Sequence, residues 1–280
     1  MIPLDIRPMG TGDLAAVDRV LAATDETVAT SSGWPYLELV HSCGRVLVGE
    51  IEGTIVGFAA AVPAGGVTHV SDLFVTPEHQ GRGIGRRLLG ELLGDAWPRS
   101  TFSSPDARAL PLYIRHGLRP SWPGCYLEGP VTALPEPDPD LEVVIIDAAQ
   151  MTEAERALDG IDRTCLHRHE ARETGSVHLA VRSGGTVVAA GHARDARKSP
   201  GRWLDRLVVA PEVDPVGPVV AALRAAASPA RPVGACVPGP HPALAVLLGR
   251  GFRIVDQDTY CESEPGLFDP TRSLPDPALL

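Results

Sequence analysis

Residues 72–89 read DLFVTPEHQGRGIGRRLL, and this stretch decides the fold. The apolar run 73–75, closed by Pro77, is typical of the end of a buried strand. From Ile84 onward the apolar residues recur at helical spacing and define one face of a helix. They are Leu88, Leu89, Leu92 and Leu93. The stretch therefore predicts a strand, a glycine-rich turn and a helix.

The turn between strand and helix has the composition of an anion site. Gly81, Gly83 and Gly85 let the backbone approach a ligand, and the first helical turn leaves N–H groups free. Guanidinium groups near the same helix end could pair with phosphate oxygens. They belong to Arg82, Arg86 and Arg87. A P-loop would need a lysine and a dinucleotide fingerprint a different glycine spacing, so another phosphate-bearing ligand is expected.

Residues 80–85, QGRGIG, resemble the Gln/Arg-x-x-Gly-x-Gly/Ala signature of the GNAT superfamily of acetyl-CoA-dependent N-acetyltransferases. Residues 109–118, ALPLYIRHGL, are similar to the closing helix and strand of that family. Leu118 replaces the usual Phe, and Asp106 stands where Asn is frequent. The resemblance implies an α+β fold, in which helices flank a mixed, mostly antiparallel sheet.

The chain also contains an internal repeat. Residues 73–78, LFVTPE, match residues 207–212, LVVAPE, at an offset of 134 that also relates Gly117 to Gly251. We therefore expect two tandem GNAT-like domains. The expected boundaries are 1–132 for an active N-terminal domain, 133–140 for a Pro-rich linker, 141–265 for a degenerate C-terminal domain and 266–280 for a tail.

The second copy loses the residues that carry the resemblance. Asp214 replaces Gln80, and Leu247 replaces Tyr113. Prolines at 215 and 218 remove N–H donors from the turn, and none of the three arginines has a basic counterpart. We expect only the N-terminal copy to bind CoA.

The resemblance also implies roles for individual residues. The backbone N–H of Leu73 would polarise the thioester carbonyl, Phe74 and Val75 would pair with the pantetheine, and Tyr113 would be the general acid. The pyrophosphate would be held by residues 80–86, which are Gln80, Gly81, Arg82, Gly83, Ile84, Gly85 and Arg86. Asp106 and Tyr113 complete the expected cofactor-binding set. A core aromatic is the alternative for Tyr113.

The general base is left open between two side chains. His69 lies six residues before Val75, where some family members carry a catalytic Glu, and its ordinary pKa of about 6.5 suits proton removal at neutral pH. Asp72 is the competitor, and a bulge in the strand could decide which of them faces the cleft. A structural role for His69, with water as the base, is the third possibility.

Composition narrows the class of partner. The net charge of −10 argues against nucleic acid, and no apolar run reaches the ~18 residues of a membrane span, so a cytoplasmic protein is expected. The five cysteines lack a CxxC pair, which predicts reduced thiols. Residues 165–170, CLHRHE, offer metal ligands on one side only if extended, so a solvated helix end and no metal are expected.

Together these observations predict an acyltransferase that uses acetyl-CoA as its donor. It would transfer the acetyl group to a primary amine of a small molecule, such as an antibiotic or a metabolite, by direct attack in a ternary complex. Acetylation of a protein N-terminus or lysine, and a non-catalytic acyl-CoA-binding regulatory module, are the alternatives. The chain would be a monomer whose halves form a pseudo-dimer, or a homodimer. Trp34 and Tyr36 would line the acceptor pocket or pack in the core.

Overall fold

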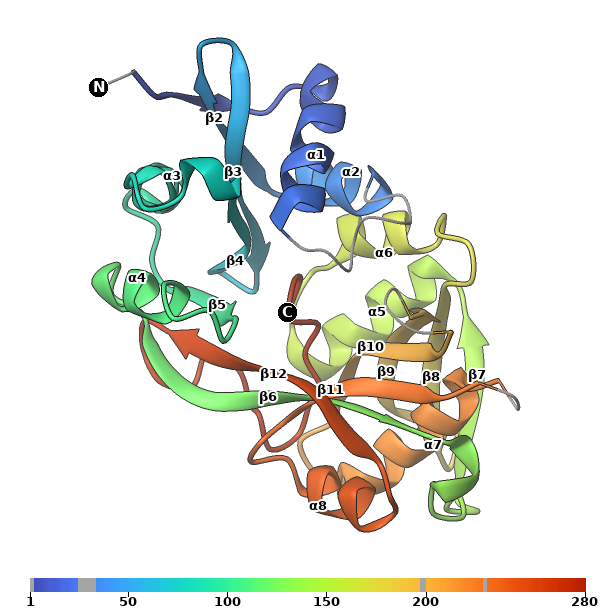
Figure 1. Cartoon of the computed structure of the whole chain (residues 1–280). Helices are drawn as coiled ribbons and strands as arrows, with labels where there is room; N and C mark the ends of the chain where they lie inside the picture. The colour runs from blue at the N-terminus through green and yellow to red at the C-terminus, as the bar shows by residue number, and fades with distance from the viewer. Residues whose placement is uncertain (1–2, 25–33, 197–199, 229–230) are drawn as a thin grey trace.

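The computed structural model of the 280-residue chain describes residues 3–24, 34–196, 200–228 and 231–280 (Figure 1). Within these residues, the first half contains ten α-helices and strands. They are β1 (Asp5–Pro8), α1 (Leu14–Thr24), α2 (Trp34–Cys43), β2 (Arg45–Ile51), β3 (Thr54–Ala64), β4 (Val67–Val75), α3 (Ile84–Leu93), β5 (Arg99–Ser103), α4 (Ala109–Arg115) and β6 (Arg119–Gly129).

The second half repeats this order with small differences. Its elements are β7 (Leu141–Ile146), α5 (Ala148–Asp159), α6 (Thr164–Glu170), β8 (Val177–Ser183), β9 (Thr186–Asp195), β10 (Arg202–Val209), α7 (Val216–Ala226), β11 (Val233–Pro238), α8 (Pro242–Gly249) and β12 (Arg253–Glu262). The expected α+β fold with two tandem GNAT-like units is therefore present. The strand, turn and helix predicted for residues 72–89 are β4, the turn and α3.

The two units share one continuous sheet of twelve strands. Its order is β1-β2-β3-β4-β5-β12-β6-β11-β10-β9-β8-β7. The last strand of each half is exchanged, because β12 pairs with β5 of the first half while β6 pairs with β11 of the second half. Since β12 and β6 also pair with each other, neither unit leaves an unpaired edge at the junction.

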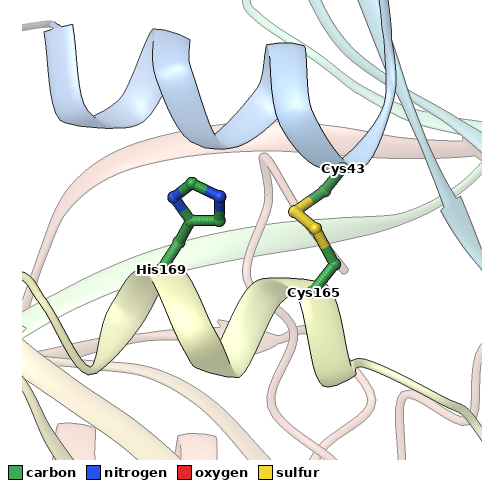
Figure 2. A group of neighbouring side chains, drawn as sticks. All are labelled: Cys43, Cys165 and His169. Atoms are coloured by element: carbon green, nitrogen blue, oxygen red, sulfur yellow. A yellow bond between two sulfur atoms is a disulfide. The ribbon is translucent and has the colours of Figure 1, made fainter.

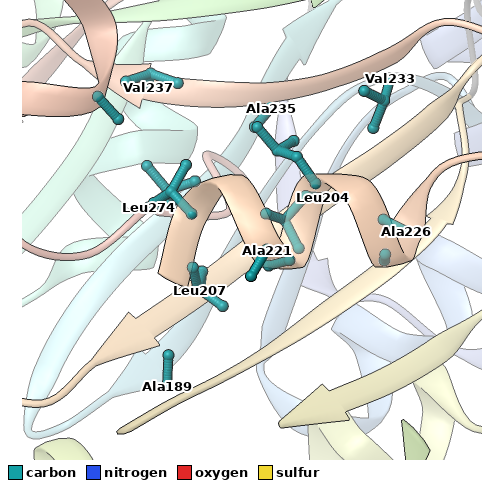
Figure 3. Close-up of a cluster of buried hydrophobic side chains, with 14 of the residues drawn as sticks. Ala189, Leu204, Leu207, Ala221, Ala226, Val233, Ala235, Val237 and Leu274 are labelled. Carbon is teal, nitrogen blue, oxygen red and sulfur yellow. The ribbon is translucent and has the colours of Figure 1, made fainter. Parts of the chain in front are cut away.

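Helices cover both faces of this sheet. In the first half, α1 and α2 enclose a core with Val48 and Phe58, and α3 encloses a second core with Leu47 and Leu88 on the opposite face. In the second half, α7 packs on β10 and β11, as Figure 3 shows for Ala221. The amphipathic pattern of α3 is thus satisfied by burial against the sheet.

The C-terminal residues 266–280, expected as a tail, are folded into the body of the protein. Leu274 is fully buried in the core around α7 (Figure 3), and Leu279 packs in the core beneath α1 and α2. Leu280 contacts the cluster formed by Trp122 and Tyr260. The proline and polar content of the segment suggested a tail, but its leucines fill space that exists only after both halves have folded.

The prediction of reduced thiols is wrong at one pair of cysteines. A disulfide joins Cys43, at the end of α2, to Cys165 in α6, with the Cα atoms 5.7 Å apart. Cys125, Cys236 and Cys261 are free and buried. The paired cysteines are 122 residues apart in sequence, so only the packing of the two halves brings them together.

Candidate functional site

The site begins at a gap in the sheet between β4 and β5. The two strands pair in parallel only where residues 68–70 face residues 99–101, and β4 then continues to Val75. Over residues 73–75 the strand pairs with β3 on one side, and no strand among the described residues pairs with its other side. Leu73, Phe74 and Val75 are partly exposed there. An extended ligand can therefore add to this backbone edge.

The glycine-rich turn follows directly at the end of β4. Gly81 and Gly83 have φ angles of 73° and 79°, a left-handed conformation that side chains disfavour. Gly83 is the N-cap residue of α3, and the Arg86 guanidinium lies 3.8 Å from the position that a Gly83 Cβ would take. Nothing within the described residues lies within 4 Å of a Cβ at Gly81. This open turn at a helix N-terminus, with a guanidinium beside it, fits the pyrophosphate of CoA.

Three polar side chains connect the glycine-rich turn to the residues that directly precede α4. Gln80 donates from Nε2 to the Val75 carbonyl at 2.9 Å, which closes the turn, and the Arg108 guanidinium donates to Gln80 Oε1. Arg108 also pairs with Asp106, and its hydrogen bonds lower the pKa of that carboxyl to about 2. The sequence motifs did not predict a role for Arg108, although this residue directly precedes Ala109 of the second motif.

The arginines of the turn do not all face the same way. Arg87 donates from its guanidinium to the Leu4 carbonyl at 3.1 Å, ahead of β1. It therefore points away from the glycine turn, contrary to the grouping of three arginines that the sequence suggested. Arg86 lies beside Gly83, as described above.

Tyr113 of α4 is buried in the core that α3 and α4 form with the sheet. Only 7% of its surface is exposed, and it packs in the core that contains Leu88 and Leu118. Burial raises its pKa to about 12, a hydrogen bond with Thr101 opposes this shift, and the charge of Asp72 adds to it. The phenol therefore keeps its proton at neutral pH.

A β-bulge in β4 decides where the two candidate bases point. Val70 pairs with Ala61 and Asp72 with Ala60, so Ser71 is the extra residue. Paired residues share a face, and Ala60 belongs to the core beneath α1 and α2. The bulge therefore places Asp72 on the same face as His69, whose partner Val62 belongs to that core as well. Without the bulge, the two side chains would have pointed to opposite faces.

Asp72 and His69 have different surroundings on this face. The Tyr36 hydroxyl of α2 donates to Asp72 Oδ2 at 2.6 Å, and 9% of Asp72 is exposed. His69 is fully buried, with Nδ1 2.9 Å from Ser100 Oγ and Nε2 3.0 Å from the Pro277 carbonyl. Because a carbonyl only accepts, Nε2 carries the proton and Nδ1 accepts from Ser100.

The environment of His69 keeps its ring neutral. Burial lowers its pKa to about 4, against the weaker opposing effect of the Pro277 carbonyl. Both ring nitrogens are occupied, so His69 would have to lose a hydrogen bond before it could take a proton. The side chain of Trp34 lies outside the described residues.

The second unit repeats this geometry but fills the gap. Residues 202–204 of β10 face residues 233–235 of β11, and a bulge recurs between Leu204 and Arg206. Beyond that point Leu274 exchanges two backbone hydrogen bonds with Leu207, of 3.0 and 2.9 Å. Ser273 Oγ also accepts from the Val209 N–H at 3.4 Å. The edge that is free in the first unit is therefore occupied in the second.

The counterpart of Asp72 in the second unit is a buried arginine. Arg206 donates to Glu155 at 2.8 Å and to Glu170 at 3.2 Å, and these charges raise its pKa above the usual value. Its neighbours His167 and His178 donate to the same two carboxylates, at 3.0 and 2.9 Å. A buried charge network therefore occupies this place.

Residues 165–170 form the helix that was expected, but not all of them are solvated. Within α6, His167 and Glu170 face the buried network. Cys165 and His169 lie on the side that faces α2, where Figure 2 shows them beside Cys43. The polar composition of the segment did not distinguish these two faces.

Comparison with known proteins decides the family. A family model described as an acetyltransferase (GNAT) domain matches residues 42–119, which include β4, the glycine turn and α4. This stretch of the first unit belongs to the GNAT superfamily. As a GNAT protein it carries an acetyltransferase domain in its first unit.

Solved structures share the fold of this GNAT protein over nearly its whole length. A putative acetyltransferase from Pyrococcus horikoshii has a TM-score of 0.68 at 16% identity, covering 92% of this chain and 88% of its own. A tandem GNAT protein from the clavulanic acid biosynthesis pathway has a TM-score of 0.56 at 17% identity, covering 95% of this chain and 100% of its own. At these identities the likeness concerns the fold.

A curated sequence relative matches part of this GNAT protein. The uncharacterized protein ML0378 of Mycobacterium leprae is 31% identical over 139 residues, which are 43% of this chain and 39% of that protein. The chain therefore spans less than half the length of this relative. In the part of the chain that the structure describes, no helix is long and apolar enough to cross a membrane.

Proposed function

We propose that this GNAT protein transfers an acetyl group from acetyl-CoA to a primary amine of a small molecule, using its first unit alone. The observation that carries the proposal is the free backbone edge of residues 73–75. It lies between a glycine turn suited to the pyrophosphate and a buried, protonated Tyr113. The glycine turn would bind the phosphates of the donor, and the backbone edge would pair with its extended arm. Tyr113 would protonate the leaving thiolate.

The second unit supports the orientation proposed for the backbone of Leu73. Its counterpart Leu207 directs both N–H and C=O toward Leu274 and away from β9. By the repeat, Leu73 would direct its N–H into the open gap. A backbone N–H fixed there would stabilise the negative charge that develops on the thioester oxygen.

The proposed step needs one acid and one base. The lone pair of the amine attacks the thioester carbonyl carbon, the C–S bond breaks, and the electron pair leaves on sulfur. Tyr113 gives its proton to the thiolate, and the attacking nitrogen loses a proton to the base. Solvent then returns a proton to Tyr113.

Asp72 is the base that this geometry favours. Its carboxylate lies on the acceptor side of the sheet, held by the Tyr36 hydroxyl, while Tyr113 lies on the opposite side. In neutral solution an amine is mostly a cation, so a carboxylate attracts it. The carboxylate takes the first proton and passes it to solvent, which frees the lone pair for attack, and it then takes the second proton from the attacking nitrogen. His69 remains the second candidate, but its acceptor nitrogen Nδ1 would first have to release the Ser100 hydroxyl.

The exchange of β6 and β12 supports a single chain as the working unit. Each half completes the sheet of the other, as the two subunits of a dimer would. We propose a monomeric pseudo-dimer whose second unit closes the acceptor side.

A thiol-release assay with acetyl-CoA and a panel of amines tests this function. Tyr113→Phe is expected to lower kcat by about 10²-fold while the Kd for CoA changes little. Gly83→Asp is expected to abolish CoA binding, by adding a negative charge and a side chain at a φ of 79°.

Gly66→Asp is the matched control for Gly83→Asp. Gly66 has a φ of 86° in the turn between β3 and β4, at the other end of β4 from the glycine turn. It carries the same backbone strain and charge and should leave CoA binding unchanged. A protein that binds CoA but acetylates no amine, with or without Tyr113, would instead be an acyl-CoA-binding module.

A further inference from the structure

A group of sulfur and nitrogen ligands joins the two units at the ends of α2 and α6. The sulfur atoms of Cys43 and Cys165 and one ring nitrogen of His169 all lie within 4.8 Å of one another. Figure 2 shows the His169 ring in the space between the two helices, next to the disulfide. Cys165 is exposed and the other two residues are half-buried, so solvent reaches the group.

We propose that Cys43 and Cys165, when reduced, bind one Zn²⁺ ion together with His169. Two thiolates and an imidazole are the donors that zinc prefers, at about 2.3 Å for sulfur and about 2.1 Å for nitrogen. Ligands at those distances around a tetrahedral ion are separated by about 3.5 Å. The two sulfur atoms, bonded in the disulfide, would move apart on reduction, and the His169 nitrogen already lies within 4.8 Å of both. Water would take the fourth position.

The helices hold these ligands in place. Cys165 and His169 are four residues apart on α6, so they lie on the same face of the helix, about one turn from each other. Cys43 is the last residue of α2, where the partial negative charge of the helix end favours a cation. No hydrogen bond or ion pair to another described residue engages the His169 ring, in contrast to His167 and His178 of the buried network.

The disulfide and the zinc site are alternative states of the same cysteines. A dithiol reductant is oxidised to its own disulfide as the Cys43–Cys165 bond accepts two electrons and two protons. Zn²⁺ then displaces both thiol protons into solvent. In either state α2 stays connected to α6, and α2 also carries Tyr36, which holds Asp72.

A second group of ligands is less suited to a metal ion. Glu170, His178 and His192 also lie within 4.8 Å of one another, and all three are buried. However, His178 already pairs with Glu170 at 2.9 Å, and the Arg206 guanidinium lies 3.2 Å from the same carboxylate. An ion would have to displace this positive charge in a closed interior.

Metal titration of the full chain tests the zinc site. The protein is reduced with a phosphine without oxygen, and Zn²⁺ binding is measured in competition with a chromophoric chelator. We expect one Zn²⁺ per reduced chain and none per oxidised chain. Co²⁺ is expected to give the near-ultraviolet sulfur-to-metal absorption of a thiolate site.

Single variants assign the ligands. Cys43→Ser and Cys165→Ser should abolish binding, and His169→Ala should weaken it at least tenfold. His169→Ala still forms the disulfide, so its oxidised form shows whether the variant folds. Cys125→Ser alters a free, buried cysteine and should bind zinc as the wild type does.

Three results would overturn the proposal. The reduced wild type could bind no zinc, the oxidised protein could bind as much as the reduced one, or Cys43→Ser could retain the ion. The last result would place zinc at another site, such as the buried group of Glu170. Because none of these measurements uses acetyl-CoA, the outcome is independent of the proposed acetyl transfer.

Discussion

Leu274 lies against Leu207 as a short antiparallel strand, with both backbone hydrogen bonds of the pair formed. In the second unit, Leu274 occupies the position that corresponds to the edge of β4 in the first unit. There, an extended ligand would add to the strand. The chain thus fills one of its two equivalent gaps with its own C-terminal segment. No strand among the described residues fills the other gap, beside Leu73, where we propose that the donor binds.

We predict that one CoA molecule binds per chain. The first unit offers a free edge and two left-handed glycines, whereas the second offers an occupied edge and prolines. Native mass spectrometry of the full chain should show a single adduct that Gly83→Asp removes and Gly66→Asp retains. Two adducts per chain would contradict the assignment of the second unit.

Leu274→Ala is predicted to destabilise the whole protein. The side chain is fully buried between α7, β10 and β11, so its truncation leaves a cavity and should cost about 2–5 kcal/mol. Urea unfolding measures the change in the free energy of unfolding. Leu248→Ala, at a leucine that is 40% exposed on α8, is the control and should cost much less. Equal effects would mean that the C-terminal segment is not held as described.

Asp72→Asn is predicted to lower kcat for amine acetylation by about 10²-fold, because the amide cannot take a proton. Binding of acetyl-CoA, measured by calorimetry, should persist. Tyr36→Phe keeps the carboxylate and removes one hydrogen bond to it, so a smaller loss is expected.

The same assay with His69→Gln separates the two candidate bases. A loss for His69→Gln that exceeds the loss for Asp72→Asn would identify the histidine as the base. It would also mean that Nδ1 gives up its hydrogen bond from Ser100 during turnover.

The stability of the protein is predicted to fall as the pH decreases from about 6.5 to about 4. His69 has its pKa lowered to about 4 in the fold, whereas an unfolded chain titrates near ~6.5. Between these two pH values the unfolded chain binds a proton at His69 and the folded chain does not. The contribution of His69 to the free energy of unfolding is therefore complete above about pH 6.5 and is lost as the pH falls toward about 4.

Urea unfolding at pH 6.5 and pH 5 measures the contribution of His69. This residue should account for a loss of about 2 kcal/mol between the two pH values. His69→Gln should remove that part of the pH dependence. An unchanged pH dependence in the variant would show that His69 titrates normally in the folded protein.

Arg206→Met is predicted to destabilise the protein by about 3–5 kcal/mol, because Glu155 and Glu170 lose the buried cation that they share and only Glu155 keeps another guanidinium, that of Arg163. Chemical denaturation measures the loss. Arg87→Met is the control, since that guanidinium makes an exposed hydrogen bond to Leu4 and should contribute within about 0.5 kcal/mol.

The sequence determined the features that depend on local chemistry. The glycine turn, the helix after it and the repeat at an offset of 134 are all properties of neighbouring residues, and together they indicate the tandem fold. The loss of chemistry in the second copy is also a local property, since prolines and Asp214 replace the glycine turn.

Only the tertiary structure decided which distant residues meet. The exchange of β6 with β12, the Cys43–Cys165 disulfide and the contact of Pro277 with His69 each join segments from opposite halves. The one-residue bulge at Ser71, which a local pattern hardly reveals, set the face of Asp72. These pairings form because the two halves bury a common junction. A sequence pattern indicates the local structure that a residue favours, but it does not indicate which distant residue the folded chain brings into contact with it.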